Sequence, residues 1–287
     1  MFRFARFFLL LLCASSGVAH AQRFFTQHDF GVVAGGSQYF GDINDNYGFA
    51  FVRPAAGLTY RHLLTPYIAV KATALGTQVG YDDALTGNPF NERRNLNFKS
   101  WIGELSVQAE FNFFRFITGD ENARFTPYLT GGIGAFYFDP YTTYKGDKVY
   151  LRPLGTEGQN TSGYGDRKYG SVSVCFPLGA GVKYWIAPGV NLSVEIADRL
   201  TLTDYMDDIS TTYVGTDQFS GFENNTARAL QDRSSEVPGV RPIGVAGKQR
   251  GNSASFDQYA TLLIGLSFQF KTYQCPSYQT ENYQYPR

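Results

Sequence analysis

The feature that most constrains this chain is a strict alternation of apolar and polar residues in segments about ten residues long. The clearest segment is 101–113, where the apolar Leu105 and Val107 alternate with the polar Glu104 and Ser106. Successive side chains of a β-strand point to opposite faces, so this pattern gives a strand with one apolar and one polar face. Past the first residues, no window has a sustained helical period. The pattern predicts an all-β fold.

The alternation recurs in eight segments along the chain. They are 28–40, 50–62, 66–79, 101–113, 125–138, 172–186, 191–202 and 260–270. The connections alternate in length as well, because those at 63–65 and 187–189 are short and those at 139–171 and 203–257 are long. An even strand number with short and long connections in turn is typical of bacterial outer-membrane barrels. We therefore predict an eight-stranded antiparallel transmembrane β-barrel over residues 22–270, with long extracellular loops, short periplasmic turns and both termini in the periplasm.

Two soluble folds remain alternatives at this point. A secreted β-sandwich has similar strands, but it gives no reason for short and long connections to alternate. A lipocalin-like barrel turns its apolar row inward around a ligand and its polar row outward. The sequence alone does not decide which row faces the interior.

The N-terminus predicts export. Two arginines stand near the start, an apolar run follows, and residues 19–21 read Ala-His-Ala, the small-x-small pattern that a signal peptidase cuts. The apolar run is shorter than the roughly 20 residues that span a bilayer, which favours a cleaved signal peptide over residues 1–21. Its removal leaves Cys175 and Cys275, too few for a disulfide framework.

Charge excludes some partners and suggests an interior network. The chain has 25 basic and 25 acidic residues and no net charge, so it has no field to attract nucleic acid, and no nucleic-acid partner is expected. If the apolar rows face lipid, the polar rows line a lumen narrow enough for side chains to fill. The predicted lumen charge network is Lys71, Glu104, Glu110, Lys183, Glu195 and Arg199, while Arg53 and Arg61 face either the lumen or solvent at strand ends. Buried charges of both signs should pair and close the barrel.

Aromatic residues gather near the predicted strand ends, at 111–114, 136–138 and 268–270. Rings of this kind are enriched where a membrane meets water. We interpret the three groups as interfacial girdles, with outer-membrane lipid as the partner of the apolar rows. Ordinary sandwich core is the alternative.

Catalytic residues are not predicted. In the proposed topology His28 and His62 lie at the periplasmic end, while Asp204, Asp207 and Asp208 lie at the outer end. A Ser/His/Asp arrangement or a His-Asp pair therefore cannot form outside the barrel, and no metal-ligand spacing of histidines occurs. We expect no enzyme activity, no cofactor, no metal and no small-molecule substrate.

The acidic run 204–208 is interpreted as a solvated loop that caps a strand with turn hydrogen bonds. A calcium site is the alternative, since clustered carboxylates suit a hard cation. Cys175 is expected to be a small lumen-facing residue rather than a nucleophile, because no histidine partner is placed near it.

The tyrosine-rich segment 271–287 follows the last predicted strand and is expected in the periplasm. Tyrosine supplies large contact area at low entropic cost, so this segment is a candidate binding strip. The residues expected to contact a periplasmic partner are Tyr273, Cys275, Pro276 and Tyr278. A disordered terminus is the alternative, and Cys275 either bridges to a partner or remains free.

Several runs resemble the PorG-type outer-membrane proteins of type IX secretion systems. They are Tyr39-Phe40-Gly41-Asp42-Ile43-Asn44, residues 127–140, Leu154-Gly155-Thr156-Glu157-Gly158-Gln159, residues 177–184 and 199–213, Gly251-Asn252, Asp257-Gln258-Tyr259 and Cys275-Pro276. The runs 153–159 and 203–213 are the most specific. The resemblance implies an outer-membrane barrel that associates with a periplasmic ring made of a lipoprotein and its partner (PorK and PorN), supporting protein export and, in some species, gliding motility. It brings no catalytic residues, and the present chain departs from the family in residues 277–287.

The leading hypothesis is therefore a non-enzymatic barrel that anchors or positions a periplasmic secretion assembly through its turns and tail. A generic small barrel of the OmpA or OmpX sort, acting in adhesion or envelope integrity through its outer loops, is the alternative. A barrel enzyme is the third reading, which histidines on the loop side would have favoured.

Overall fold

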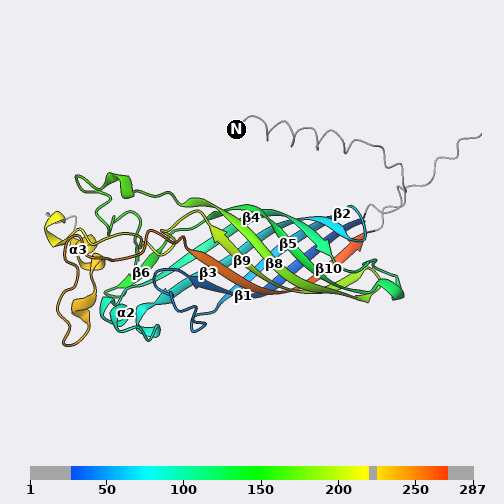
Figure 1. Ribbon diagram of the computed structural model, residues 1–287, viewed down its shortest axis with the longest axis horizontal. Helices are drawn as coiled ribbons and strands as arrows, with labels where there is room; N and C mark the ends of the chain where they lie inside the picture. Colours follow the sequence, from blue (N-terminus) through cyan, green and yellow to red (C-terminus); the bar gives the residue numbers. More distant parts are fainter. Residues whose placement is uncertain (1–26, 220–224, 271–287) are drawn as a thin grey trace, which may run out of the picture.

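The computed structural model describes residues 27–219 and 225–270. Eight long strands form an antiparallel barrel, whose tilted wall is seen in Figure 1. They are β1 (Gln27–Phe40), β2 (Arg53–Leu63), β3 (Ile68–Asp82), β4 (Asn97–Asn112), β5 (Phe125–Tyr137), β8 (Val172–Ala187), β9 (Val190–Thr201) and β10 (Gln258–Phe270). Neighbours in the wall follow the order β3-β2-β1-β10-β9-β8-β5-β4, and β3 also pairs with β4. That last pairing closes the sheet and confirms the predicted eight-stranded barrel.

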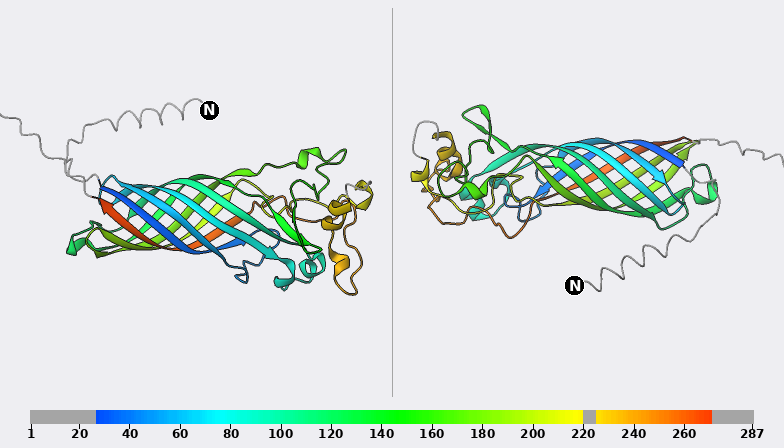
Figure 2. Two further views of the ribbon diagram at one scale, coloured as in Figure 1. Left: turned by 180° about the vertical axis from the view of Figure 1, so that it is seen from behind. Right: turned by 90° about the horizontal axis from the view of Figure 1, so that it is seen from above.

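The two ends of the barrel differ in the length of their connections (Figure 2). At one end, which we name the turn end, the links are 64–67, 113–124 and 188–189, and His28 of β1 stands opposite Phe270 of β10. At the other end, which we name the loop end, the connections are 41–52, 83–96, 138–171 and 202–257. The predicted alternation of short and long connections is therefore present.

The apolar rows of the strands face outward and the polar rows face inward. On β4, Leu105 is 69% exposed whereas the adjacent Glu104 is 1% exposed. The same contrast recurs on β10, where Leu262 is 55% exposed and the adjacent Thr261 is 2% exposed. A water-soluble barrel or sandwich buries its apolar rows, so both soluble alternatives are excluded. An apolar exterior around a closed hydrogen-bonded wall is the arrangement that a bilayer requires of a β-protein.

Strands β3 and β4 are longer at the loop end than predicted. They stay paired to Asp82 and Asn97, whereas the alternation suggested limits at residues 79 and 101. Near this end the inward row changes from polar to apolar, with Tyr81 and Phe98 both buried. These side chains begin a second core at the loop end.

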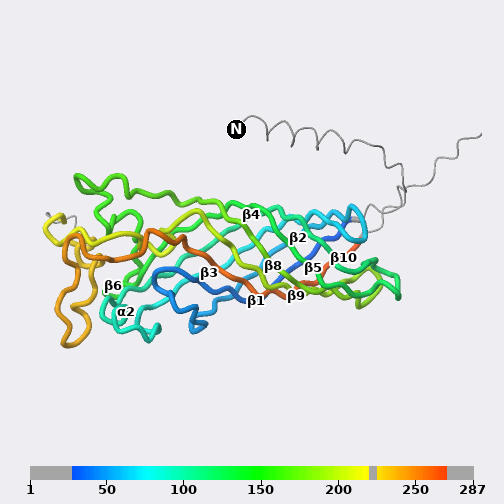
Figure 3. Tube along the Cα trace, viewed as in Figure 1, coloured from blue at the N-terminus to red at the C-terminus, as the bar shows by residue number. Residues whose placement is uncertain are grey.

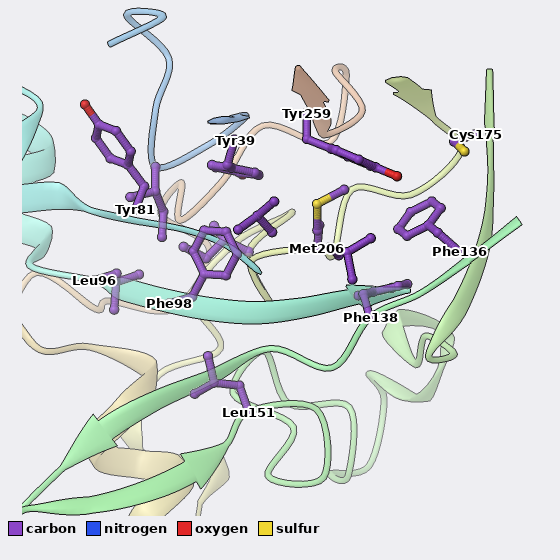
Figure 4. Close-up of a cluster of buried hydrophobic side chains, with 14 of the residues drawn as sticks. Tyr39, Tyr81, Leu96, Phe98, Phe136, Phe138, Leu151, Cys175, Met206 and Tyr259 are labelled. Atoms are coloured by element: carbon purple, nitrogen blue, oxygen red, sulfur yellow. The ribbon is translucent and has the colours of Figure 1, made fainter. Parts of the chain in front are cut away.

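The loop-end core joins strand residues to the loops that fold over the barrel mouth (Figure 4). Its buried members are Tyr39, Ile43, Val79, Tyr81, Leu96, Phe98, Ile102, Phe136, Phe138, Leu151, Cys175, Met206, Ile209, Leu230 and Tyr259. The interpretation of Phe136 and Phe138 as girdle residues is therefore wrong, because each is 1% exposed. Tyr137, between them, does face outward. Cys175 is a free, buried lumen-facing thiol, as predicted.

The path of the chain through the long loops can be followed in Figure 3, and these loops carry short elements of their own. They are η2 (Asp83–Leu85), α2 (Pro89–Arg94), the hairpin of β6 (Tyr141–Tyr144) and β7 (Asp147–Tyr150), η4 (Gly165–Arg167), η5 (Thr216–Gln218), α3 (Asn225–Gln231) and η7 (Ser234–Glu236), while η3 (Glu121–Ala123) lies at the turn end. The hairpin was not predicted, because its strands are too short for alternation to stand out. Within residues 27–219 and 225–270, no helix is long and apolar enough to cross a bilayer.

Candidate functional site

Ion pairs fill the middle of the barrel. Lys71 Nζ on β3 lies 2.6 Å from Glu195 Oε2 on β9, and Tyr128 donates a hydrogen bond to the same carboxylate oxygen. Arg199 Nε lies 3.0 Å from Glu104 Oε2, which also accepts a hydrogen bond from Tyr259. Each carboxylate therefore has both a cation and a phenol, so little of its charge is left unpaired.

Glu110 is the centre of a second group of lumen charges. Its Oε2 lies 3.0 Å from Arg61 Nε, and its Oε1 is paired with Lys183. Arg61 is 3% exposed, so of the two alternatives for this residue the lumen position is the one that the structure has. The alternation did not single out Asp29, whose Oδ2 is 4.0 Å from Arg61 Nη1 and accepts a hydrogen bond from Ser267.

The acidic and basic side chains in the middle of the lumen are equal in number, and they leave almost no empty volume between them. The lumen groups that take part are Asp29, Glu104, Glu110 and Glu195 with Arg61, Lys71, Lys183 and Arg199. The cavity among Lys71, Tyr128, Glu195 and their neighbours has a volume of about 10 Å³. That is close to the smallest space that holds one water molecule. The described lumen is thus packed with side chains at this level.

Arg53 differs from the other candidate lumen residues. It is only partly buried, and its guanidinium carbon lies 3.7 Å from the ring centroid of Phe51. It stands at the first position of β2, where the strand leaves the loop end. The alternative reading, at a strand end, fits this residue.

The acidic run 204–208 is folded into the loop-end core. Asp207 and Asp208 are 1% and 0% exposed, and Met206, which precedes them, is fully buried. The solvated-loop interpretation is therefore wrong. In the described residues no group of three or more His, Cys, Asp or Glu side chains is arranged to hold a metal ion.

Two buried carboxyl groups of this region meet at one hydroxyl. Tyr39 Oη lies 2.6 Å from Asp207 Oδ2 and 2.6 Å from Asp257 Oδ1. The remaining oxygens accept backbone hydrogen bonds from Ile209 and Met206. Burial raises the pKa of Asp257 to about 8 and raises the pKa of Asp207 well above its ordinary value. A raised pKa favours the protonated, neutral form of a carboxyl group, and a protonated carboxyl group can donate a hydrogen bond to the Tyr39 hydroxyl.

Glu157 fixes the loop 138–171 to the loop 202–257. Its carboxylate accepts hydrogen bonds from the backbone N–H groups of Ser210 and Thr211 and lies 3.0 Å from Arg250 Nη1. Next to it, the hydroxyl of Thr156 donates to Asp208 Oδ2. The two most specific runs of the sequence, 153–159 and 203–213, therefore contact each other directly.

Arg94 joins three loops in the same layer. Its guanidinium binds both carboxylate oxygens of Asp83, at 2.7 and 2.8 Å, and donates to the backbone oxygens of Asp42 and Arg250. Arg94 is 2% exposed. We call this layer, built around Glu157, Arg94 and the Tyr39 hydroxyl, the loop-end plug.

Sequence reasoning missed most of the loop-end plug. Glu157 was included in a resembling run, but Arg94, Asp83 and Arg250 were not singled out. The available signal was their type, since charged loop residues need partners if they become buried. The ion pairs Arg94–Asp83 and Arg250–Glu157 join residues 11 and 93 positions apart, so the pairing has no local signature.

The two histidines lie together at the turn end, remote from the plug. His28 and His62 stand opposite each other in β1 and β2, with ring centroids 5.1 Å apart. The acidic residues 204–208 are at the loop end. The sequence-based expectation that these groups do not meet agrees with the described fold. The predicted contact residues Tyr273, Cys275, Pro276 and Tyr278 lie outside the described residues, as does the predicted signal segment 1–21.

Several solved barrels resemble this fold at low identity. The attachment invasion locus protein Ail of Yersinia pestis is 10% identical, with 86% of this chain and 100% of that chain covered at a TM-score of 0.41. Neisserial surface protein A is 10% identical, with 85% of this chain and 97% of that chain covered at a TM-score of 0.39. The N-terminal barrel domain of Pseudomonas aeruginosa OprF is 10% identical, with 86% of this chain and 100% of that chain covered at a TM-score of 0.36. At such values the likeness gives no information on function. No curated protein matches the sequence.

The wall, the exterior and the interior described above identify a small outer-membrane β-barrel. A family profile described as a domain of unknown function (DUF6089) matches residues 5–225, which include seven of the eight barrel strands and the two runs joined by Glu157. The match covers well over half of the chain. The protein therefore belongs to the DUF6089 family.

Proposed function

We propose that this chain is a non-enzymatic anchor in the outer membrane that holds the periplasmic ring of a type IX secretion system in position, supporting protein export and, where the organism glides, motility. The observation that supports this role most is the filled lumen. A barrel whose charges are paired across a cavity of about 10 Å³ has no path for a solute. Its role is then positional, because the barrel fixes a point in the membrane to which another protein binds.

The turn end is the proposed contact surface for the ring, made of a lipoprotein and a partner that resemble PorK and PorN. This orientation places both termini in the periplasm. The link 113–124 is the longest at this end and exposes Phe113 and Phe114, at 50% and 56%. Rings at the membrane boundary, followed by a polar turn with the Arg115–Asp120 ion pair, offer a mixed surface for a partner. The tail residues Tyr273, Cys275, Pro276 and Tyr278 are proposed to extend it.

The choice of a PorK- and PorN-like ring as the partner rests on the sequence runs that resemble the PorG-type family. Two of them form the loop-end plug, through Glu157, Ser210 and Thr211. These runs therefore support a shared fold with that family. The contacts with the ring are proposed at the turn end, where these runs do not lie. The partner must be tested directly for that reason.

Affinity isolation from gently solubilised outer membranes tests the anchor role. A tag placed in the exposed hairpin turn at Lys145 and Gly146 leaves the turn end free. Recovery of a periplasmic ring protein in a fixed ratio to the barrel is the expected result, and recovery of the barrel alone would overturn the proposal. The double variant Tyr273→Ala/Tyr278→Ala should reduce recovery, whereas Tyr150→Ala, on β7 at the loop end, should leave it unchanged.

A generic barrel acting in adhesion or envelope integrity is the second candidate function. The observation that favours it is the ordered loop end, where buried ion pairs hold the long loops in one arrangement. Loss of cell attachment or envelope integrity on deleting the gene, with secretion unchanged, would select this candidate.

A further inference from the structure

A cavity of about 430 Å³ opens at the loop end, opposite the proposed ring contacts. Its walls come from the three loops 41–52, 83–96 and 202–257. The volume falls in the range of small-ligand sites. Nothing in the anchor role requires a cavity at this place.

The cavity is built on the buried Arg94. This guanidinium binds Asp83 in one loop, the backbone oxygen of Asp42 at 2.8 Å in a second, and that of Arg250 at 2.7 Å in a third. All three walls are thus tied to one side chain that is 2% exposed. The site is formed before any ligand arrives, which reduces the entropic cost of binding.

Aromatic rings and carboxamides dominate the lining. Tyr47, Phe90 and Phe256 are 60%, 44% and 60% exposed, so their rings are open to a ligand. The carboxamides of the lining include Asn88, Asn91, Gln249, Asn252 and Gln258. A carboxamide both donates and accepts hydrogen bonds, as a ligand hydroxyl does. An apolar C–H face packs favourably on an aromatic ring, whose face is electron-rich.

The charges around the cavity disfavour an anion. Arg94 is neutralised by Asp83, and Arg250 by Glu157. The lining carboxyl groups are Asp42, whose two oxygens accept from the backbone N–H of Asn252, and the exposed Asp45. A phosphate or sulfate group would meet these acids without a free cation.

We propose that this cavity binds a neutral oligosaccharide, with sugar rings stacked on Tyr47, Phe90 and Phe256 and hydroxyl groups bound by the carboxamides. The sequence predicts no small-molecule substrate and leaves open whether the outer loops bind a ligand, and the proposed site is independent of the anchor role at the turn end. A free oligosaccharide and the sugar head of a glycolipid share the chemistry. Phe40, Tyr47 and Gln258 also line a groove of about 610 Å³ on the outer wall, together with the apolar Leu178 and Ile196, so a lipid-linked sugar has a path beside the barrel.

Titration of the full-length barrel with neutral trisaccharides tests the proposal. Maltotriose, cellotriose and N-acetylchitotriose are added to protein in a zwitterionic or amine-oxide detergent, because maltoside detergents carry a competing sugar. Saturable binding of at least one trisaccharide is expected by calorimetry or saturation-transfer NMR. Phe256→Ala and Tyr47→Ala should each weaken it about tenfold or more, equivalent to about 1.4 kcal/mol. Tyr150→Ala removes an exposed loop-end ring outside the cavity and should have no effect.

Two further arms identify the ligand class and its source. Choline, an organic cation, is titrated beside the trisaccharides, and sugar binding without choline binding is expected. In lipid nanodiscs, a neutral diglycosyl diacylglycerol that displaces the trisaccharide identifies a lipid-linked source, and failure to displace identifies a free one; both results support the sugar site. Absence of binding by all three trisaccharides, or binding only of choline or inorganic phosphate, overturns the proposal and leaves the anchor role untouched.

Discussion

Asp207 and Asp257 approach the same hydroxyl oxygen, that of Tyr39, and each is 2.6 Å from it. A phenol has one proton and can donate to only one of them. The other carboxyl oxygen must carry a proton of its own to make a hydrogen bond at this distance. The geometry therefore requires one neutral carboxyl group in the loop-end plug, in agreement with the raised pKa of Asp207 and the rise of that of Asp257 to about 8.

The first prediction concerns pH. The pKa of Asp257 is about 8 in the folded protein and about 4 when unfolded. Because the folded value is the higher one, its contribution to stability is complete below about pH 4, diminishes as pH rises, and is absent above about pH 8. Amide hydrogen exchange of residues 204–211 should accelerate progressively over this interval.

The control for this prediction is Asp257→Asn, which mimics the neutral acid. It should flatten the pH dependence without abolishing it, since burial also raises the pKa of Asp208 to about 6 and that of Asp204 to about 9. The exposed Asp147→Asn should leave the profile unchanged. Exchange that slows as pH rises in the wild type, after correction for the intrinsic rate, would contradict the assignment.

A second prediction follows from Gly41. A Cβ atom at this position would lie 2.1 Å from Asp257 Oδ1 and 2.1 Å from Tyr39 Oη, so Gly41→Ala must push the two groups apart. Overpacking of this kind costs about 1–3 kcal/mol. Gly103→Ala is the matched control, because nothing lies within 4 Å of its added methyl group. Hydrogen exchange in residues 204–211 should rise in the first variant only, with equal rates in both counting against the argument.

The third prediction concerns the lumen. Glu110→Gln leaves Arg61 and Lys183 buried without their shared carboxylate, and removing one partner of a buried ion pair costs about 3–5 kcal/mol. The temperature at which the compact, fast-migrating band converts to the unfolded band on a gel should fall. Glu121→Gln, exposed at the turn end, should not change it.

Conductance in planar bilayers is a second, independent test of the filled lumen. The wild type should show no steady channel, because its lumen charges are paired and packed. A stable ohmic channel in the wild type would contradict the filled lumen.

The fourth prediction addresses Glu157. Glu157→Gln removes the charge that binds Arg250 and weakens the hydrogen bonds to Ser210 and Thr211, with an expected cost of about 3–5 kcal/mol. Limited proteolysis should then cut the loop 202–257 faster. Glu236→Gln is the control, because it removes only the ion pair of Glu236 with Arg233 near the surface. Such a pair contributes about 0–1 kcal/mol to stability, so the protease should cut this variant at the wild-type rate.

The parts of the molecule that the sequence predicted are those governed by a local rule. Side chains alternate along a strand, so Lys71, Glu104, Lys183 and Glu195 could be assigned to one face without knowledge of any partner. The rule does not predict where along the barrel axis the inward-facing residues change from polar to apolar. For that reason Phe136 was assigned outward, although it packs in the loop-end core with Tyr259 at 5.9 Å between ring centroids.

The loop-end plug obeys no local rule. Asp207 and Asp208 read as solvated because charged loop residues usually are, and only distant residues make them buried. Glu157 binds Ser210 and Thr211 from 53 and 54 residues away. Contacts at such separations follow from the closed wall, which brings the four long loops over one opening, and no single segment contains that information.

The lumen pairs also constrain how the barrel assembles. Arg61 and Glu110 are 49 residues apart, Glu110 and Lys183 are 73, Glu104 and Arg199 are 95, and Lys71 and Glu195 are 124. A nascent sheet that lacks its later strands holds these charges without partners, and an unpaired charge is costly to bring into lipid. Insertion before closure is thereby penalised, and the chain gains its full stability only when the last strand meets the first. Contacts of such long range also make folding slow, so this barrel should depend on assistance until the moment it closes.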